Sequence, residues 1–542
     1  MNYDEFAKQI GKGERKMKMK KCLALILGIT LLVSSLAACG NTKKETTEEP
    51  TNSSTGTVTT TKDGETVVTY SLSEDFYTWD PAGQPSMPSY IARILIYDTL
   101  IESDHAGNYT PSLATSWSVS EDGKDWSFQL RDDVTFSNGE PFNAECVKAT
   151  FERMAKDDTL AMHYLWVNLD SVEVVDDYNC IFHFTQPYGA FLSEISVASI
   201  LPAKALAEQG ADLFKTNPGT GAWKFVSYDP GNETVFERND EYWGGQKSNV
   251  DKIVFKPISE DTTRISGLKT GEINIAGDIP PDQAMALEGQ EALVVQQDPG
   301  LTMCFMSLET GEGKVFSDKN ARLALMHCID RELIVDSILG SGTPAYWPTM
   351  EGVIGYDADA VNSKEYAKYD PDMAKQLLAD SSYNGEEIYF MAIDGKVPRT
   401  KEVLQAIQAM MTAVGFNVKL EIMEGATFVA KRSAGEYDLG FSNIFYGNGS
   451  SLNHANMHYV SDSAHTEFVN EEQLSLINEA SMTVDLDKQN ELMRQAFQIA
   501  MQEGAPMQYV LSLDMFAIYT SNIENIVVFP DGVMDLRNIT VK

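Results

Sequence analysis

Basic residues are scarce in this chain of 542 residues. It has 42 lysines and arginines against 79 aspartates and glutamates, which gives a net charge of −37. A negative electrostatic field repels phosphate, so it excludes nucleic acid as a main partner. It also argues against binding to anionic lipid through a basic surface. It does not identify what the protein binds, because only the charges close to a site decide that.

Cysteine is also scarce, with six in the whole chain and no pair at Cys-x-x-Cys spacing. A zinc ribbon or a thioredoxin-type motif is therefore not indicated. We interpret the four cysteines of the chain body as small buried hydrophobes. A disulfide between two of them stays open, because sequence does not select a pair. These residues are Cys146, Cys180, Cys304 and Cys328.

The common motifs of secreted hydrolases are lacking. The chain contains neither the His-Glu-x-x-His pattern of zinc proteases nor the Gly-x-Ser-x-Gly nucleophile elbow. Carboxylates are abundant, but abundance does not make a catalytic pair. We predict no enzyme activity and no cofactor. A secreted hydrolase is the alternative, and two carboxylates facing each other across a cleft would favour it.

No apolar run near the start reaches the length of a membrane span. The run Leu23–Val33 follows a lysine-rich stretch and precedes small residues. It is shorter than the ~20 residues that a spanning helix needs. A basic start, a short apolar run and a small-residue end predict a secretory signal over residues 1–38. Three acidic residues precede the lysines, so we expect translation to begin at Met17 or Met19. A single anchoring helix is the alternative interpretation.

The end of that segment, Leu36-Ala37-Ala38-Cys39, resembles the lipobox of bacterial lipoproteins. The resemblance implies that Cys39 becomes the lipidated N-terminus, which anchors the protein outside the cell membrane by acyl chains. Residues 39–64 are polar and poor in apolar side chains, so we predict a flexible tether there. The removed segment carries seven basic and three acidic residues, which takes the net charge from −37 to −41.

Strand-like and helix-like patterns alternate along the rest of the chain, which predicts a mixed α/β fold. Asn143 is a suitable N-cap for one of the helices. Asp176-Asp177 marks the turn of a predicted hairpin over residues 172–184, and Glu-Asp-Gly marks another over residues 117–126. Helices are predicted at 89–101, 144–154, 261–270, 318–329, 331–339, 371–380 and 398–414, and strands at 65–71, 126–130, 250–256, 386–392, 416–423 and 510–519.

From residue 65 onward, ordered sequence blocks resemble the extracytoplasmic solute-binding proteins of ABC importers. The nearest group is the dipeptide/oligopeptide/nickel class, solute-binding protein family 5. We interpret most of these blocks as architectural, with turns at the Asp-Gly and Asn-Gly pairs. We expect the Asp330-Arg331 pair to be a structural ion pair rather than a ligand contact. The blocks are Leu113–Trp117 with Asp122-Gly123, Phe136–Pro141, Gly219–Gly221, Asn239–Trp243, Gly271–Ala276, Asn320–Leu325 with Ile329-Asp330-Arg331, and Tyr437–Leu439.

The resemblance implies an α/β two-lobe clamp of the periplasmic-binding-protein type. Its first lobe would be discontinuous, over residues 65–103, 206–300 and 510–542. An inserted subdomain would cover 104–205, and the second lobe 301–509. The solute would bind in the cleft between the lobes, which closes by hinge bending.

The implied function is that of a substrate-binding lipoprotein, which delivers a peptide to the permease and ATPase subunits of an ABC importer. Peptide-binding relatives hold the ligand ammonium with an aspartate, but Gly447 occupies that position here, and Ser450-Ser451 replaces an Asp-Pro pair. A buried ammonium without a carboxylate is costly. Glu424 and Glu436 are candidate substitutes. Alternative ligands are an oligosaccharide or another neutral solute, and a nickel complex or heme.

The predicted ligand contacts come from several segments of the chain. Aromatic, amide and backbone groups around Phe445 suit stacking and hydrogen bonding. His454 and His458 share a face if their stretch is helical, which makes them a weak metal pair near a predicted surface loop. We predict no metal site. The predicted ligand-binding residues are Met87, Ser89, Tyr90, Tyr164, Trp166, Trp347, Phe445, Tyr446, Gly447 and Asn448.

Overall fold

The structure is a computed structural model, and it describes all residues except 1–58, 61–63, 85, 105–106, 396 and 460–469. The predicted signal, Cys39 and most of the predicted tether lie outside the described residues. Within the tether range, Thr59–Thr60 form strand β1, which pairs with β2 (Thr66–Leu72). The described part of the chain belongs to one compact unit, Ser54–Lys542.

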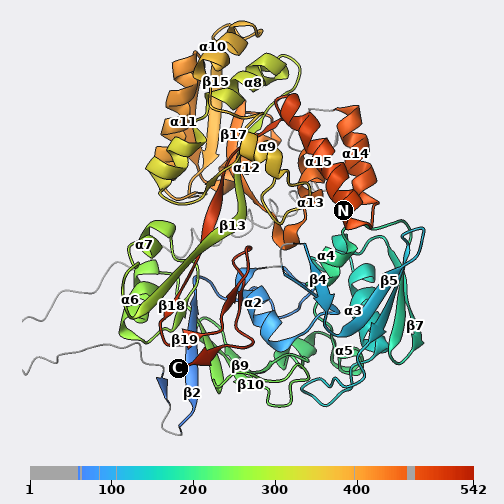
Figure 1. Ribbon diagram of the computed structural model, residues 1–542. Helices are drawn as coiled ribbons and strands as arrows, with labels where there is room; N and C mark the ends of the chain where they lie inside the picture. The colour runs from blue at the N-terminus through green and yellow to red at the C-terminus, as the bar shows by residue number, and fades with distance from the viewer. Residues whose placement is uncertain (1–58, 61–63, 85, 105–106, 396, 460–469) are drawn as a thin grey trace, which may run out of the picture. The chain divides into compact units, whose positions relative to one another are not determined.

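One large mixed sheet of 12 strands organises the fold (Figure 1). Its path is β16-β15-β17-β13-β18-β12-β2-β11-β10-β9, with β1 beside β2 and β14 beside β18. Besides β1 and β2, the strands of this sheet are β9 Trp223–Asp229, β10 Glu233–Arg238, β11 Lys252–Pro257, β12 Ile275–Ala276, β13 Leu293–Leu308, β14 Thr343–Pro344, β15 Glu387–Ile393, β16 Asn417–Met423, β17 Leu439–Phe445 and β18 Met507–Thr520.

Two long antiparallel strands, β13 and β18, connect the two ends of this sheet. They pair along most of their length, with register shifts between Pro299 and Thr302 and between Cys304 and Phe305. One end of the pair contacts β17 and the other contacts β12. Two of the predicted lobe limits fall inside these strands, one near position 300 in β13 and the other near position 510 in β18. The domain limits themselves stay a prediction.

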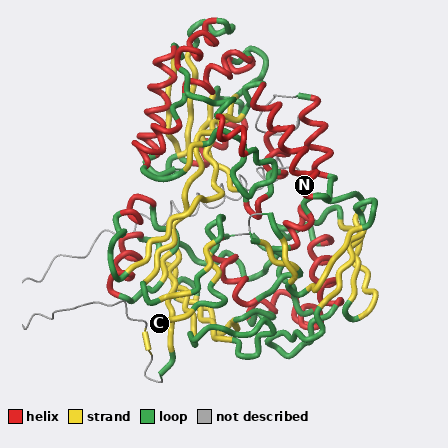
Figure 2. Tube along the Cα trace, in the orientation of Figure 1, coloured by secondary structure: helices red, strands yellow, loops and turns green. Residues whose placement is uncertain are grey.

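Three helices pack against the β15–β17 end of the sheet, as Figure 2 shows. α8 (Lys319–Cys328) begins where the Asp318 carboxylate accepts hydrogen bonds from backbone N–H groups. α10 (Pro371–Ala379) begins at an Asp370 cap followed by proline, and α11 (Thr400–Val414) ends at Gly415, whose φ is +116°. These caps satisfy backbone groups that a helix end leaves unpaired.

A separate four-stranded sheet, β5-β6-β8-β7, lies in residues 114–184. Its strands are β5 Ala114–Val119, β6 Asp125–Leu130, β7 Leu169–Asp176 and β8 Asn179–Phe184. α3 (Ala144–Lys156) packs on it, and the Asn143 side chain caps this helix as predicted. Phe182 and Phe191 pack in the core of this part, with ring centroids 5.3 Å apart.

α2 (Met87–Ile96) packs on the β2–β11 part of the large sheet. Ile91 and Leu95 are buried there beside Val68. The prediction of a helix over 89–101 is wrong at its end: Tyr97 has extended backbone angles, and residues 101–103 form β3. Apolar periodicity alone did not distinguish the helix from the strand that follows it.

The remaining elements connect these layers. They are β3 Ile101–Ser103, β4 Tyr109–Pro111, η1 His163–Leu165, α4 Phe191–Ile195, α5 Ala203–Gln209, η2 Gly210–Lys215, α6 Asp261–Thr270, α7 Pro281–Met285, η3 Val315–Ser317, η4 Leu333–Leu339, α9 Ala358–Ser363, α12 Gly425–Ser433, η5 Gly447–Gly449, α13 Leu452–Tyr459, α14 Glu471–Ser481, α15 Leu486–Gln502, β19 Ile523–Glu524, β20 Val527–Val528, β21 Met534–Asp535 and β22 Thr540–Val541. Within the helix predicted over 331–339, residues Leu333–Leu339 form a π-helix.

Several sequence blocks have the architectural role that we predicted. The Asp98 carboxylate is buried and accepts hydrogen bonds from Thr220 Oγ1 (2.8 Å), Trp243 Nε1 (2.8 Å) and Tyr242 OH (3.1 Å). This one carboxylate therefore joins two of the blocks. Burial raises the pKa of Asp98.

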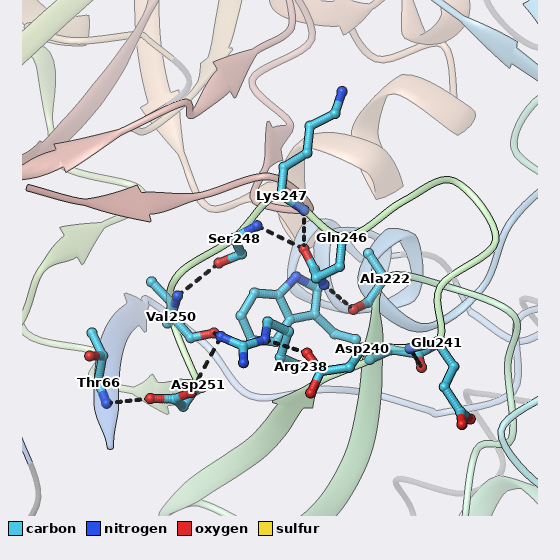
Figure 3. Close-up of polar contacts among 12 residues, drawn as sticks. Thr66, Ala222, Arg238, Asp240, Glu241, Gln246, Lys247, Ser248, Val250 and Asp251 are labelled. Atoms are coloured by element: carbon cyan, nitrogen blue, oxygen red, sulfur yellow. Dashed lines mark hydrogen bonds and ion pairs between the residues drawn. The ribbon is translucent and has the colours of Figure 1, made fainter. Parts of the chain in front are cut away.

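Figure 3 shows polar contacts around the loop between β10 and β11. Arg238 contacts Asp240 and Asp251, and Asp251 in turn accepts a hydrogen bond from the Thr66 backbone N–H at 2.8 Å. The Gln246 side chain donates to the carbonyl of Ala222 at 2.8 Å. These contacts fix the loop between β10 and β11 to the edge of the sheet, so they are structural.

The predicted Asp330-Arg331 ion pair is wrong. Arg331 is buried and donates to four backbone carbonyls instead, while Asp330 accepts a hydrogen bond from the Leu333 backbone N–H at 2.9 Å. The Arg331 side chain has the structural role that we predicted. It stabilises the fold through backbone carbonyl oxygens rather than through an ion pair with Asp330. The four acceptors are Tyr509 O at 2.8 Å, Ala367 O at 3.0 Å, and Met326 O and Ile329 O at 3.2 Å.

The four cysteines of the chain body are buried and free, as their interpretation as small hydrophobes predicts. Cys146 and Cys180 lie in the core around the four-stranded sheet, and Cys304 and Cys328 in the core of the β15–β17 end. No disulfide joins any of these four.

Candidate functional site

A cavity of about 360 Å³ lies beside α2, and we call it the α2 cavity. Three residues of α2 line it: Met87, Tyr90 and Arg93. Their spacing of three places them on one face of the helix, while Ile91 and Leu95 are buried in the core. The other walls come from residues 154–166, residues 194–198, Phe445 and Gly447 after β17, and Asp531 and Val533 near the C-terminus.

Five of the predicted ligand contacts line this cavity. They are far apart in the sequence, and they surround one space. Phe445 is 46 % exposed at the end of β17, which leaves its ring available to a ligand. Trp166 also lines the cavity and is almost fully buried. The five are Met87, Tyr90, Trp166, Phe445 and Gly447.

Two other predicted contacts are core residues in this structure. Trp347 Nε1 donates to the carbonyl of Gly355 at 2.7 Å, and the Tyr446 hydroxyl donates to the carbonyl of Pro348 at 2.6 Å. Both side chains are 1 % exposed. Burial raises the pKa of Tyr446 far above its usual range. Their contact with a solute stays a prediction.

Ser89 and Tyr164 are not among the described residues that line the cavity. The Ser89 hydroxyl accepts a hydrogen bond from Ser86 Oγ at 2.9 Å in the first turn of α2. Tyr164 is 63 % exposed in η1, while its neighbours Leu165 and Trp166 line the cavity. Asn448 belongs to η5, and its side chain lies outside the described part. Their role in binding also stays a prediction.

Three buried charged residues line the α2 cavity, and the sequence reasoning missed them. Arg93, Glu194 and Asp531 are 9 %, 7 % and 8 % exposed. The sequence pattern could have indicated two of them, because Arg93 and Glu194 are charged residues within otherwise apolar stretches that form helices. A charge there needs either a partner or a function. Asp531 lies in a Pro-Asp-Gly turn, where aspartate is common without any function.

The three charges differ in what they contact. Arg93 donates from a guanidinium nitrogen to the carbonyl of Pro81 at 2.6 Å, and burial lowers its pKa. An Asp531 carboxylate oxygen accepts a hydrogen bond from the Val533 backbone N–H at 3.1 Å. Burial raises the pKa of Glu194 to about 7, opposed by a hydrogen bond from the Asn453 side chain.

The carboxylates that we considered as substitutes for the missing aspartate lie elsewhere. Glu424 precedes α12, Glu436 follows it, and both are exposed. Neither lines the α2 cavity. The buried acid in the cavity is Glu194, which comes from α4 rather than from the segment after β17.

His454 and His458 lie in helix α13, so they share a face as the spacing predicts, with ring centroids 4.6 Å apart. The expectation of a surface loop is wrong, because they are 1 % and 4 % exposed. Nε2 of His454 lies 3.0 Å from the Tyr509 hydroxyl. In the described ranges, no group of three or more potential metal ligands occurs.

A second cavity of about 640 Å³ lies against β13. Its walls come from the segments 296–303 and 343–352 and from Pro530, and the predicted contact Trp347 is one of the residues that line it. It shares no lining residue with the α2 cavity. The α2 cavity is the better candidate site despite its smaller volume, because it combines an exposed aromatic ring with three buried charges.

The chain matches the bacterial extracellular solute-binding proteins, family 5 Middle, over residues 108–465. It is 29% identical to the probable D,D-dipeptide-binding periplasmic protein of Escherichia coli K12, over 66% of this chain and 69% of that protein. It is 27% identical to the nickel-binding periplasmic protein of the same organism, over 65% of this chain and 70% of that protein.

Solved structures resemble this fold over most of the chain. The substrate-binding protein CtaP of Listeria monocytogenes superposes with a TM-score of 0.80 at 19% identity, covering 88% of this chain and 99% of that one. A dipeptide-binding protein of Pseudoalteromonas sp. SM9913, in complex with Met-Leu, gives 0.71 at 22% identity, covering 88% and 100%.

This chain belongs to family 5 of the bacterial extracellular solute-binding proteins, the substrate-binding proteins of ABC importers. The fold is the α/β periplasmic-binding-protein fold that the resemblance predicts. Its function is to bind a solute, and its family consists of binding proteins rather than enzymes. None of the helices in the described part of the chain is long and apolar enough to cross a membrane.

Proposed function

We propose that this protein captures a short peptide in the α2 cavity and delivers it to the permease and ATPase subunits of an ABC importer. The observation that carries the proposal is the make-up of the cavity. Methionine, aromatic and aliphatic walls suit apolar side chains, while Arg93 and two carboxylates suit the charged ends of a peptide. Relatives that bind dipeptides and glutathione, itself a peptide, support the same ligand class.

The alternative ligands have weaker support. The case for a neutral oligosaccharide rested on the missing aspartate after β17, and Glu194 supplies a carboxylate to the same cavity from another element. The case for a nickel complex rested on His454 and His458, and neither residue lines either cavity. A peptide needs both a cation-binding and an anion-binding group, and the α2 cavity has both.

A hydrolase is the alternative from another class, since Glu194 and Asp531 line one cavity. Asp531 already accepts a backbone hydrogen bond, and Arg93 lies in the same walls. We therefore expect binding without catalysis. Mass spectrometry of peptides and oligosaccharides incubated with the protein tests this, and cleavage products would contradict it.

A thermal-shift screen tests the ligand class. A ligand that binds only the folded state raises the melting temperature. We expect pools of short synthetic peptides to raise it and pools of oligosaccharides to leave it unchanged. A rise with oligosaccharides alone would show that the peptide assignment is wrong.

Replacing Phe445 by alanine tests the site itself. A ring of this kind, half-exposed without ligand, loses further apolar area when a ligand covers it. We expect affinity to fall about tenfold, equivalent to ~1.4 kcal/mol. Isothermal titration calorimetry with a peptide from the screen measures the loss. Tyr369→Ala is the matched control, because Tyr369 is 42 % exposed and lies outside the cavity. Equal affinities of the two variants would remove Phe445 from the site.

We also propose that the protein is a lipoprotein anchored outside the cell membrane through Cys39. A Cys39→Ser variant lacks the thiol that the lipid modifies, so it should move from the membrane fraction to the soluble extracytoplasmic fraction. Cell fractionation followed by N-terminal mass spectrometry checks this and also identifies the start of the mature chain. Cys22→Ser, inside the predicted signal, is the control and should remain in the membrane fraction.

A further inference from the structure

Glu194 is the buried group of the α2 cavity that has the least compensation. Its side chain is 7 % exposed, and it lines the cavity from the short helix α4. Asp531 accepts a backbone N–H hydrogen bond, whereas the Glu194 carboxylate has a hydrogen bond with the neutral Asn453 side chain. No positive side chain in the described ranges is close enough to affect its pKa. A buried carboxylate without a cation is costly unless it is protonated or a ligand supplies the charge.

The position of Glu194 places it where a ligand contacts several elements. Helix α4 contacts η5, the short turn that includes Gly447, and Asn453 lies at the start of the next helix. Just before α4, the Gly189 backbone N–H donates to the carbonyl of Ser481 at 2.9 Å. Glu194 therefore lies at the contact between the part that carries the four-stranded sheet and the part that carries α13 and α14.

The surrounding cavity favours one kind of cation. Trp166 and Phe445 provide aromatic rings, which attract ammonium groups. The remaining walls are mostly apolar, and Arg93 disfavours a second positive group. An ammonium attached to a chain with apolar side groups fits these walls better than a bare metal ion, because the described ranges offer no cluster of metal ligands.

We propose that Glu194 binds the amino-terminal ammonium of the peptide and restricts this protein to ligands that have a free amino group. This inference rests on the proposed peptide function and adds the specificity-determining residue. Glu194 takes the role that the missing aspartate after β17 would have, but from a different element. An ammonium next to the carboxylate restores the charge pairing that burial removes.

The pH dependence of binding follows from the groups around Glu194. Tyr109, Tyr164 and Tyr188 are its titratable neighbours, and all three have raised pKa values, so they stay neutral below pH 8. Arg93, whose pKa is lowered by burial, and Asp531 line the same cavity. With a pKa of about 7, Glu194 loses its proton between pH 6 and pH 8. Peptide affinity should therefore rise from pH 5 to pH 7.5 and fall once the peptide amino group loses its proton near ~8.

The test uses the full protein and two matched peptide pools. Each pool contains synthetic dipeptides to tetrapeptides of alanine, leucine, methionine and phenylalanine, with free amino termini in one and acetylated amino termini in the other. The best binder is identified by mass spectrometry and titrated by calorimetry against wild type and Glu194→Gln. We expect the free peptide to bind wild type about 100-fold more tightly than its acetylated form, a ratio typical of a buried charge pair. Glu194→Gln should remove that preference and flatten the pH profile.

Each outcome decides one claim. If neither pool binds, the proposed peptide function fails, and this inference fails with it. If both pools bind wild type equally, the peptide function stands and Glu194 is not the ammonium site. If Glu194→Gln keeps the preference and the pH profile, the ammonium binds elsewhere.

Two controls separate a lost contact from a lost fold. Glu121→Gln removes an exposed carboxylate in the β5–β6 turn and should leave both affinities unchanged. The comparison of free and acetylated peptides on wild type needs no variant, so it stays decisive if Glu194→Gln does not fold.

Discussion

Replacing Arg331 by methionine lowers the free energy of unfolding by about 3–5 kcal/mol, because it removes a buried cation from the groups that hold it. The guanidinium is 2 % exposed and donates to four backbone carbonyls at 2.8–3.2 Å. Burial lowers its pKa to about 10, so it is still charged at neutral pH and depends on those carbonyls for compensation. Methionine fills much of the volume but leaves the carbonyls without their donor.

Urea unfolding followed by circular dichroism measures the effect of Arg331→Met. Arg494→Met is the matched control, because its side chain is 43 % exposed and forms surface ion pairs with Glu491 and Asp357. Exposed pairs of this kind contribute about 0–1 kcal/mol. Equal unfolding midpoints for the two variants would contradict the structural role of Arg331.

Replacing Asp98 by alanine should lower the free energy of unfolding by about 4 kcal/mol, because three donors lose the buried carboxylate that they share as acceptor. These donors are the hydroxyls of Thr220 and Tyr242 and the indole N–H of Trp243. They come from two of the sequence blocks that led to the family. The loss should therefore loosen the contact between the end of α2 and the loop before β11.

Differential scanning calorimetry of Asp98→Ala beside Asp122→Ala measures this. Asp122 lies in the exposed turn of the β5–β6 hairpin and bonds locally to Ser120. We expect a small change in melting temperature for Asp122→Ala and a drop several times larger for Asp98→Ala. A similar small change in both would show that the Asp98 contacts contribute little.

Much of the fold could be predicted because its signals are local. Helix 261–270 has the predicted limits, and the Asn143 cap begins α3 where expected. Both signals come from side chains that act within a few residues of the chain. The end of α2 was missed because the apolar pattern continues into β3, and only tertiary contacts separate the two.

The candidate site could be predicted only in part. The family resemblance led to Met87, Tyr90, Phe445 and Gly447, which meet in one cavity. Glu194 was missed because its closeness to Phe445 depends on contacts between residues about 250 positions apart in the sequence, which no local pattern encodes. Residue type could not show that Trp347 is buried and Phe445 is exposed, because both are large aromatics in predicted loops.

The acidic composition of the chain has little influence on the site. The walls of the α2 cavity are mostly apolar, and the decisive charge is a single buried carboxylate. The acidic residues on the surface do not affect which ligand the cavity binds, because solvent screens their charges.

Native mass spectrometry of the purified protein tests the central claim most directly. A solute that binds tightly enough to co-purify appears as added mass, and denaturation releases it for identification. We predict a short peptide with apolar side chains and a free amino terminus, and no added mass on Glu194→Gln. An oligosaccharide, a metal complex or an N-terminally blocked peptide in the wild-type protein would contradict the account.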